Sequence, residues 1–270
     1  MIDSKDDMKI SVLSSGSGGN VSYIETAKHK ILLDAGLSGV KIKKLLSSIN
    51  KNIEDVDTLL VTHEHNDHCK SVGVLARRYP QISVYANEKT WIAMDSKVGK
   101  ISSFQKNIFP PNVVLSFDDL DIESFTVSHD AAQAQFYNFH HHNKSFVVLT
   151  DIGYISERIV KTIQNANAYV FECNHDVEML RNGPYAWSLK QRILGDSGHL
   201  SNEDGADALI ECIGNNTKNI FVGHRSHHNN TKLLAHSTVA EILKRHDFAV
   251  GNDFNLLDTD VNCPSKLITL

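Results

Sequence analysis

Short hydrophobic runs separated by polar turns fill most of the first half of the chain. VDTLLVT (residues 56–62) is an almost continuous apolar run, which is typical of a buried strand, and SVGVLARRY has the length and spacing of a helix. The other runs are short and bounded by turn residues, and they predict strands at KISVLS, NVSYIE, KILLD, ISVYAN, VVLSF, DIESFTVS, QFYNFH and KSFVVLTD. A polar tip between the last two predicts a hairpin.

The second half of the chain alternates between helical and strand patterns. Helix ISERIVKTIQNA leads to strand AYVFEC, helix SNEDGADALIECIG leads to strand NIFVGH, and a final helix covers LLAHSTVAEILKRH. A strand-rich half followed by such alternation predicts an α/β fold of two sheets packed face to face, with helices on both outer faces. No internal repeat, low-complexity segment or proline-rich linker interrupts the pattern, so residues 1–270 are expected to form a single domain.

Composition narrows the class of protein. Hydrophobic residues make up 41% and charged residues 22%, as in ordinary globular proteins. We expect a cytoplasmic protein without a membrane span, because no secretion signal or apolar run of about 18 residues is present and the four cysteines lack CxxC spacing. The net charge of −5 gives no general attraction to nucleic acid, so such binding would use metals or local basic patches such as Lys41, Lys43 and Lys44.

The segment HEHNDH, directly after the run VDTLLVT, is dense in metal-binding side chains. The zinc motif HExxH is excluded, because Asp67 stands four positions after His63. In an extended segment His63 and His65 point to the same side, whereas Asp67 and His68 lie beyond the bend and can reach a second ion. Imidazole and carboxylate groups suit Zn²⁺, Mn²⁺ or Fe²⁺. A solvated polar loop is the alternative, and this density of ligands disfavours it.

Further ligand types follow other predicted strands. His129, Asp151 and His224 each end an apolar run, in FTVSH, FVVLTD and IFVGH. A lone histidine is more often a packed or surface residue, but three independent strand ends in one chain favour a shared site. Asp34 ends ILLD in the same way and is expected to orient a ligand histidine.

The series ILLDAG, THEHNDH, SHD, LTDIG and GHRS resembles the metallo-β-lactamase fold over nearly the whole chain. The resemblance implies a four-layer αββα sandwich with two divalent metal ions at one sheet edge and a hydroxide between them as the nucleophile. Asp151 would bridge the two ions. The remaining ligands by this resemblance are His63, His65 and His129 for one ion, and Asp67, His68 and His224 for the other.

Proteins of this superfamily hydrolyse lactams, thioesters, lactones and phosphodiesters, so the fold leaves the reaction open. Here FECNHD and DSGHLSNED resemble the ribonuclease Z-like branch, in which a histidine and a glutamate assist the leaving group. The resemblance implies that His199 donates a proton and that Glu172 orients it, with Asp67 as a further catalytic residue. The alternative for His199 is a residue that only begins a helix.

SSGSGGN, FECNHD, GHLSNED and GHRSHHNN are most similar to the YycJ/WalJ/VicX-like subgroup. Those bacterial cytoplasmic proteins are associated with a two-component regulatory system of the cell wall and with 5′-to-3′ exonuclease activity on DNA. The chain departs from their pattern at Arg225, usually a leucine, and at His228, usually acidic. The interval between Asp151 and His224 is too short for an inserted β-CASP domain, so we expect an open site that accepts single-stranded DNA ends.

Several polar residues are expected to contact substrate. SSGSGGN could offer backbone N–H groups to a phosphate, although a flexible turn is equally compatible with its composition. The expected contacts are Asn20, Asn174, His175, Ser201 and Ser226.

The main hypothesis is therefore a two-metal phosphodiesterase acting on DNA ends, 5′-phosphorylated or single-stranded. One alternative is a small-molecule metallo-hydrolase that cleaves a thioester, lactone, lactam or cyclic phosphodiester. His199 and Glu172 argue against cleavage at a carbonyl, which needs no second acid at that place. Another alternative is a non-catalytic regulator, and the complete ligand set argues against it.

Overall fold

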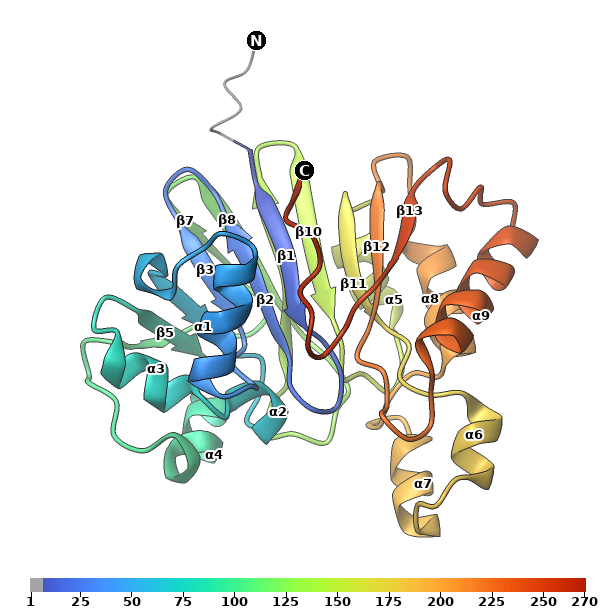
Figure 1. Ribbon diagram of the computed structural model, residues 1–270, viewed down its shortest axis with the longest axis horizontal. Helices are drawn as coiled ribbons and strands as arrows, with labels where there is room; N and C mark the ends of the chain where they lie inside the picture. The colour runs from blue at the N-terminus through green and yellow to red at the C-terminus, as the bar shows by residue number, and fades with distance from the viewer. Residues whose placement is uncertain (1–6) are drawn as a thin grey trace.

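The computed structural model describes residues 7–270, which form two seven-stranded sheets packed against each other (Figure 1). The first sheet has the strand order β14 (Ile268–Thr269), β1 (Lys9–Ser14), β2 (Val21–Glu25), β3 (Lys30–Leu33), β4 (Thr58–Leu60), β5 (Ser83–Ala86) and β6 (Lys106–Ile108). The second has the order β13 (Asn255–Asp258), β12 (Asn219–Gly223), β11 (Ala168–Glu172), β10 (Lys144–Leu149), β9 (Gln135–His141), β8 (Leu120–Thr126) and β7 (Val114–Phe117).

Helices cover the outer face of each sheet, and three short helices lie at one end of the sandwich (Figure 1). The first sheet is covered by α1 (Gly39–Ser48), α3 (Val72–Arg78) and α4 (Glu88–Val98), and a 3₁₀ turn spans Ile53–Asp55. The second is covered by α5 (Glu157–Ile163), α8 (Asn202–Cys212) and α9 (Lys232–Arg245). The short helices are α2 (Asn66–Cys69), α6 (Val177–Asn182) and α7 (Trp187–Ile193). The predicted αββα sandwich is confirmed.

Two apolar clusters hold the layers together. Leu33 and Leu60 of the first sheet pack with Phe136 and Phe171 of the second in the cluster between the sheets. A second cluster joins the outer face of the first sheet to α1, α3 and α4, for example through Leu46. Burying a side chain of this size contributes about 1.5–3 kcal/mol to folding. No helix among residues 7–270 is long and apolar enough to cross a membrane.

The sheet topology sets the position of the polar residues that follow the strands. β3 and β4 are parallel in the first sheet, as are β10, β11 and β12 in the second. The carboxyl ends of parallel strands share one edge, where crevices form in α/β proteins. Asp34, Asp151 and His224 each follow such a strand with φ of 63°, 53° and 50°, a left-handed conformation that turns the chain sharply at this edge.

Candidate metal centre

A cavity of about 350 Å³ opens at this edge, between α2 on one side and α7 on the other. Its lining includes five of the seven predicted ligands, together with His199. The five are His65, Asp67, His129, Asp151 and His224. The other two, His63 and His68, are fully buried beneath it. Segments far apart in the sequence therefore deliver their ligand side chains to one place.

One group of donor atoms comes from His63, His65 and His129, whose ligand nitrogens lie within 4.8 Å of one another. Nε2 of His129 is 3.2 Å from Nδ1 of His65. Nε2 of His63 is buried and has no hydrogen-bond partner among the described residues. A buried ring nitrogen without a partner costs free energy unless it binds something, and a metal ion among three imidazoles satisfies that requirement.

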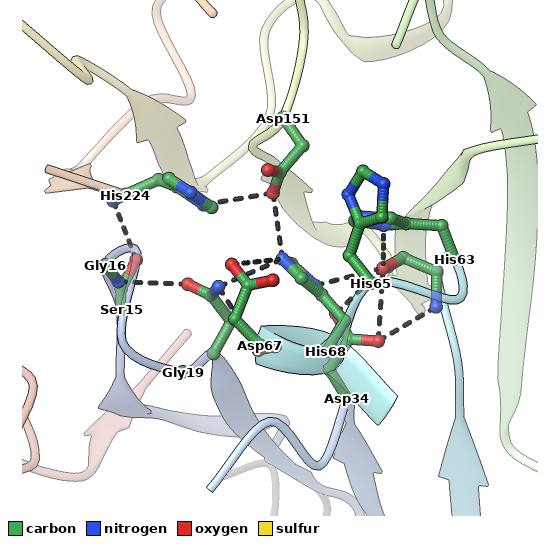
Figure 2. Close-up of polar contacts among 12 residues, drawn as sticks. Ser15, Gly16, Gly19, Asp34, His63, His65, Asp67, His68, Asp151 and His224 are labelled. Carbon is green, nitrogen blue, oxygen red and sulfur yellow. Dashed lines mark hydrogen bonds and ion pairs between the residues drawn. The ribbon is translucent and has the colours of Figure 1, made fainter. Parts of the chain in front are cut away.

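A second group lies beside the first and centres on Asp151, as Figure 2 shows. Its Oδ2 atom is 2.9 Å from Nε2 of His68 and 3.0 Å from Nδ1 of His224. Oδ2 of Asp67 is 3.7 Å from the same nitrogen of His68. The other oxygen of Asp151 lies 3.7 Å from Nε2 of His129, in the first group. The Asp151 carboxylate thus faces both groups, one oxygen toward each.

Buried hydrogen bonds orient three of the ligand histidines, which are His63, His68 and His129. Asp34 accepts from Nδ1 of His68 at 2.7 Å, from the Thr62 backbone N–H at 2.8 Å and from the Thr62 hydroxyl at 3.0 Å. The hydroxyl of Thr62 in turn lies 2.9 Å from Nδ1 of His63. Nδ1 of His129 donates to the Gly198 carbonyl at 3.3 Å. With Nδ1 engaged, each ring presents Nε2 to the cavity side, which is how metal-binding histidines are usually held.

The carboxylates also control the charge of His68. Burial disfavours its protonated ring, but Asp151 and Asp34 outweigh burial and hold the pKa of His68 well above its usual range. A cation placed between these groups would replace that proton, because a ligand imidazole must be neutral. Nitrogen and carboxylate donors in two adjoining sets fit two divalent ions of the Zn²⁺, Mn²⁺ or Fe²⁺ type.

His199 and Glu172 form a pair at the wall of the cavity. Nδ1 of His199 donates to Oε1 of Glu172 at 2.9 Å, which leaves Nε2 of the ring for the cavity. Oε2 of Glu172 accepts from the backbone N–H groups of Ile152 at 2.9 Å and Leu200 at 3.3 Å, so the carboxylate is fixed at both oxygens. Burial lowers the pKa of His199, but the Glu172 carboxylate overrides it and raises that pKa to about 9.

The predicted substrate contacts divide into two sets. Asn174 and Ser226 line the cavity, and the Asn174 amide donates to the His224 carbonyl at 2.9 Å. His175 and Ser201 are each 1% exposed and do not line it. Ser201 caps α8 instead, with its hydroxyl oxygen accepting from the Asp204 backbone N–H at 3.0 Å and donating to the Asp204 carboxylate at 2.7 Å. Asn20 is also buried, and its amide nitrogen lies 2.9 Å from Nε2 of His68, beside the second group of donors.

Several lining residues were not anticipated from the sequence, among them Lys97, Tyr185 and Arg192. Lys97 of α4 donates to the Glu64 carbonyl at 2.8 Å, and Arg192 of α7 pairs with Asp130 next to His129. Tyr185 lies between α6 and α7. No local pattern marks any of them, because only the folded position of α4, α6 and α7 brings them to the cavity.

The two departures from the subgroup pattern have different surroundings. The guanidinium group of Arg225 donates to the carbonyls of Val222 at 2.6 Å and of Thr259. It therefore ties the end of β12 to the segment after β13 instead of lining the cavity. The ring of His228 lies 5.7 Å from that of Tyr185, so this departure faces a lining residue.

Comparison with known proteins identifies a matching family and relatives of nearly the same length. Residues 29–222 match the model of the beta-lactamase superfamily domain. The chain is 55% identical to "Exodeoxyribonuclease WalJ" of Streptococcus pneumoniae, over 96% of this chain and 97% of that protein. It is 50% identical to "Exodeoxyribonuclease YycJ" of Bacillus anthracis, over 96% and 98% of the two chains.

Solved structures agree on the fold. The metallo-beta-lactamase fold protein YhfI from Bacillus subtilis superimposes with a TM-score of 0.71 at 15% identity, over 96% of this chain and 99% of that one. Zn²⁺-bound PqqB from Methylobacterium extorquens gives 0.69 at 13% identity, over 96% and 99%. At these identities the likeness concerns the fold alone. Together with the family match and the two close relatives, it shows that the chain belongs to the beta-lactamase superfamily and has the metallo-β-lactamase fold.

Proposed function

We propose that this protein is a metal-dependent exodeoxyribonuclease that removes nucleotides from the 5′ end of single-stranded DNA. The observation that carries the proposal is the hydrogen-bonded pair of His199 and Glu172 on the wall of the cavity that holds the donor groups. Such a pair suits a reaction whose leaving group is a poor one, such as the alkoxide released from a phosphodiester. The names of the two close relatives, both exodeoxyribonucleases, support the same choice.

The ligand residues define where the reaction takes place. His63, His65 and His129 would hold one ion, while Asp67, His68 and His224 would hold the other, with Asp151 shared between them. Divalent ions bound there would supply Lewis acidity and would lower the pKa of water towards neutrality, so that hydroxide could serve as the nucleophile. Asp34 and Thr62 keep the rings of His63 and His68 in position for this task.

The remaining residues handle the other side of the scissile bond. His199, protonated at Nε2 and held at Nδ1 by Glu172, donates a proton to the departing 3′ oxygen. Asn174 and Ser226 line the same cavity and offer hydrogen bonds to the phosphate or sugar of the substrate. Lys97, which forms no ion pair among the described residues, adds positive charge close to the phosphates, whereas the charge of Arg192 is paired with Asp130. General acid assistance of this kind contributes roughly 10²–10⁴ in rate.

A substrate panel tests the proposal. Purified protein loaded with Mn²⁺ is incubated with single-stranded DNA that is 5′-phosphorylated, with the same sequence as RNA, and with a lactone and a thioester. We expect mononucleotides to appear from the 5′ end of the DNA. If the metal-loaded protein leaves both nucleic acids intact but opens the lactone or the thioester, it is a small-molecule hydrolase.

We also propose that residues 1–270 act as one domain in the cytoplasm. The cluster between the two sheets is continuous, and all four cysteines are free thiols. A functional link to a two-component regulatory system follows only from the similarity to WalJ.

A further inference from the structure

A second hollow lies on the outside of the first sheet, between α1 and α3. Its volume is about 650 Å³, and we name it the α1–α3 groove. Val40 and Val74 give it an apolar surface and are 77% and 48% exposed. Isolated exposed valines are common, but two on facing helices with a cavity between them form a surface to which apolar groups can bind.

Positive charge surrounds this apolar surface. Lys43, Lys44, Lys70 and Arg78 line the groove, and no aspartate or glutamate is among its described lining residues. Lys43 is neutralised by Glu54 at 2.5 Å. Lys44, Lys70 and Arg78 have no ion pair within residues 7–270 (Arg78 lies over the Tyr79 ring instead). In a chain with a net charge of −5, this local excess of cations favours an anionic ligand.

The groove adjoins the candidate metal centre through α2. Asn66 begins this helix and lines the cavity of the metal centre, whereas Lys70 directly follows the helix and lines the groove. The Lys70 backbone N–H donates to the Asn66 carbonyl at 3.1 Å, so a single helical turn separates the two hollows. One turn rises about 5.4 Å. A polymeric ligand that leaves the cavity across Asn66 therefore reaches the groove within a very short distance.

We propose that the α1–α3 groove binds the part of a single-stranded DNA that continues beyond the end held at the metal centre, an inference that rests on the proposed nuclease function. Single-stranded DNA matches both features, because its phosphates pair with cations and its bases cover apolar surface. Lys44, Lys70 and Arg78 contact phosphates, and Val40 and Val74 contact bases. The groove thus sets the affinity for long substrates, while the metal centre acts on the terminal nucleotide.

The test compares the double variant Lys44→Glu/Lys70→Glu with the control Lys218→Glu/Lys244→Glu. The control makes the same charge change at exposed lysines remote from the groove, one beside β12 and one on α9. Two substrates are used with Mn²⁺, a single-stranded DNA of roughly 30 nucleotides and thymidine 5′-(p-nitrophenyl phosphate), which is too short to reach the groove. Binding of a phosphorothioate DNA of the same length is measured by fluorescence anisotropy at several salt concentrations.

For the groove variant we expect KM for the long DNA to rise roughly tenfold and the slope of log K against log salt to fall by about 1.4, or about 0.7 for each lost phosphate contact. The short substrate and the control variant should keep wild-type kinetics. Equal effects of the two double variants on the long DNA would overturn the proposal.

Other outcomes separate this inference from the proposed function. If wild-type protein hydrolyses neither substrate, the nuclease function fails, and the anisotropy measurement still decides whether the groove binds DNA. If the groove variant binds the long DNA as wild type does but no longer sediments with anionic phosphatidylglycerol vesicles, the groove is a membrane-binding surface and the DNA assignment is wrong.

Discussion

Replacing Asp34 with asparagine tests whether the buried carboxylate under the metal centre prepares His68 to bind metal. Oδ1 of Asp34 accepts from the Thr62 backbone N–H at 2.8 Å, and Oδ2 accepts from Nδ1 of His68 at 2.7 Å. An asparagine has only one acceptor oxygen, so in either orientation its NH₂ group faces a buried donor. The backbone itself tolerates the change, because asparagine readily adopts the φ of 63° found at residue 34.

The size of the effect follows from that mismatch. If the NH₂ group faces His68, the ring gives up its Nδ1 proton and carries one on Nε2, the atom that should bind the ion. If it faces Thr62, a buried N–H loses its partner and the loop that carries His63 is displaced. Either loss costs about 1–3 kcal/mol. Metal affinity should therefore fall roughly 10–100-fold, as when other orienting partners of ligand histidines are removed.

Calorimetric titration of metal-free protein with Mn²⁺ measures this, and the chain offers a matched control. Asp57, at the opposite end of β4, accepts from the Lys30 N–H at 2.7 Å, the Thr58 hydroxyl at 2.6 Å and Nδ1 of His29 at 3.1 Å. Asp57→Asn changes a similar set of bonds away from the metal centre and should leave Mn²⁺ affinity unchanged. Wild-type affinity in Asp34→Asn, or an equal loss in both variants, would show that Asp34 does not prepare His68 for the metal.

Three further predictions concern the same centre. Glu172→Gln keeps an acceptor for the two backbone N–H groups but sets an amide against Nδ1 of His199, so kcat on DNA should fall roughly 10²-fold or more while two Mn²⁺ still bind, as counted by metal analysis. Gly36→Ala places a Cβ 1.6 Å from the Asp67 carbonyl oxygen, whereas a Cβ at Gly18 meets nothing within 4 Å. Titration with Mn²⁺ should show lost binding only for Gly36→Ala, and equal binding by both alanine variants would contradict this close approach. When the free metal concentration is about 100 times Kd, each bound ion adds about 2.7 kcal/mol to the free energy of unfolding, and chelation should remove this stabilisation. The resulting fall in Tm of roughly 5 °C or more is measured by calorimetry, and an unchanged Tm would mean that the donors hold no ion.

The fold was predictable where burial imposes a pattern. VDTLLVT was expected to be a buried strand, and β4 lies within it, parallel to β3 and β5 on its two sides. The hairpin of β9 and β10 was also predicted correctly. The pair α6 and α7 was missed, because helices of six and seven residues carry little periodicity. Trp187 at the start of α7 is 64% exposed, although the outer face of a surface helix is usually polar. The edge strand β14 has two residues, too few for any alternation.

The gathering of the donor residues at one place was predictable, because each of them follows a strand end. Parallel strands end at one edge, so Asp151 and His224 could be placed together without knowledge of their contacts. The burial of each site residue was not predictable, because it depends on packing between segments that are distant in the sequence. His175 is buried by an isolated bridge to Ser201, which brings the start of α8 close against the end of β11. The rim residues Lys97, Tyr185 and Arg192 depend in the same way on helices whose positions no local pattern encodes.

In the proposed reaction a phosphodiester is hydrolysed beside the His and Asp donors while His199 protonates the leaving oxygen. The direct measurement is kcat of wild type and of His199→Ala on two substrates that differ in the leaving group. Thymidine 5′-(p-nitrophenyl phosphate) releases a stable phenolate that needs no proton, whereas DNA releases a basic alkoxide. His199→Ala should lose roughly 10²–10⁴ in kcat on DNA and little on the p-nitrophenyl ester. An equal loss on both substrates would show that His199 does not protonate the leaving oxygen.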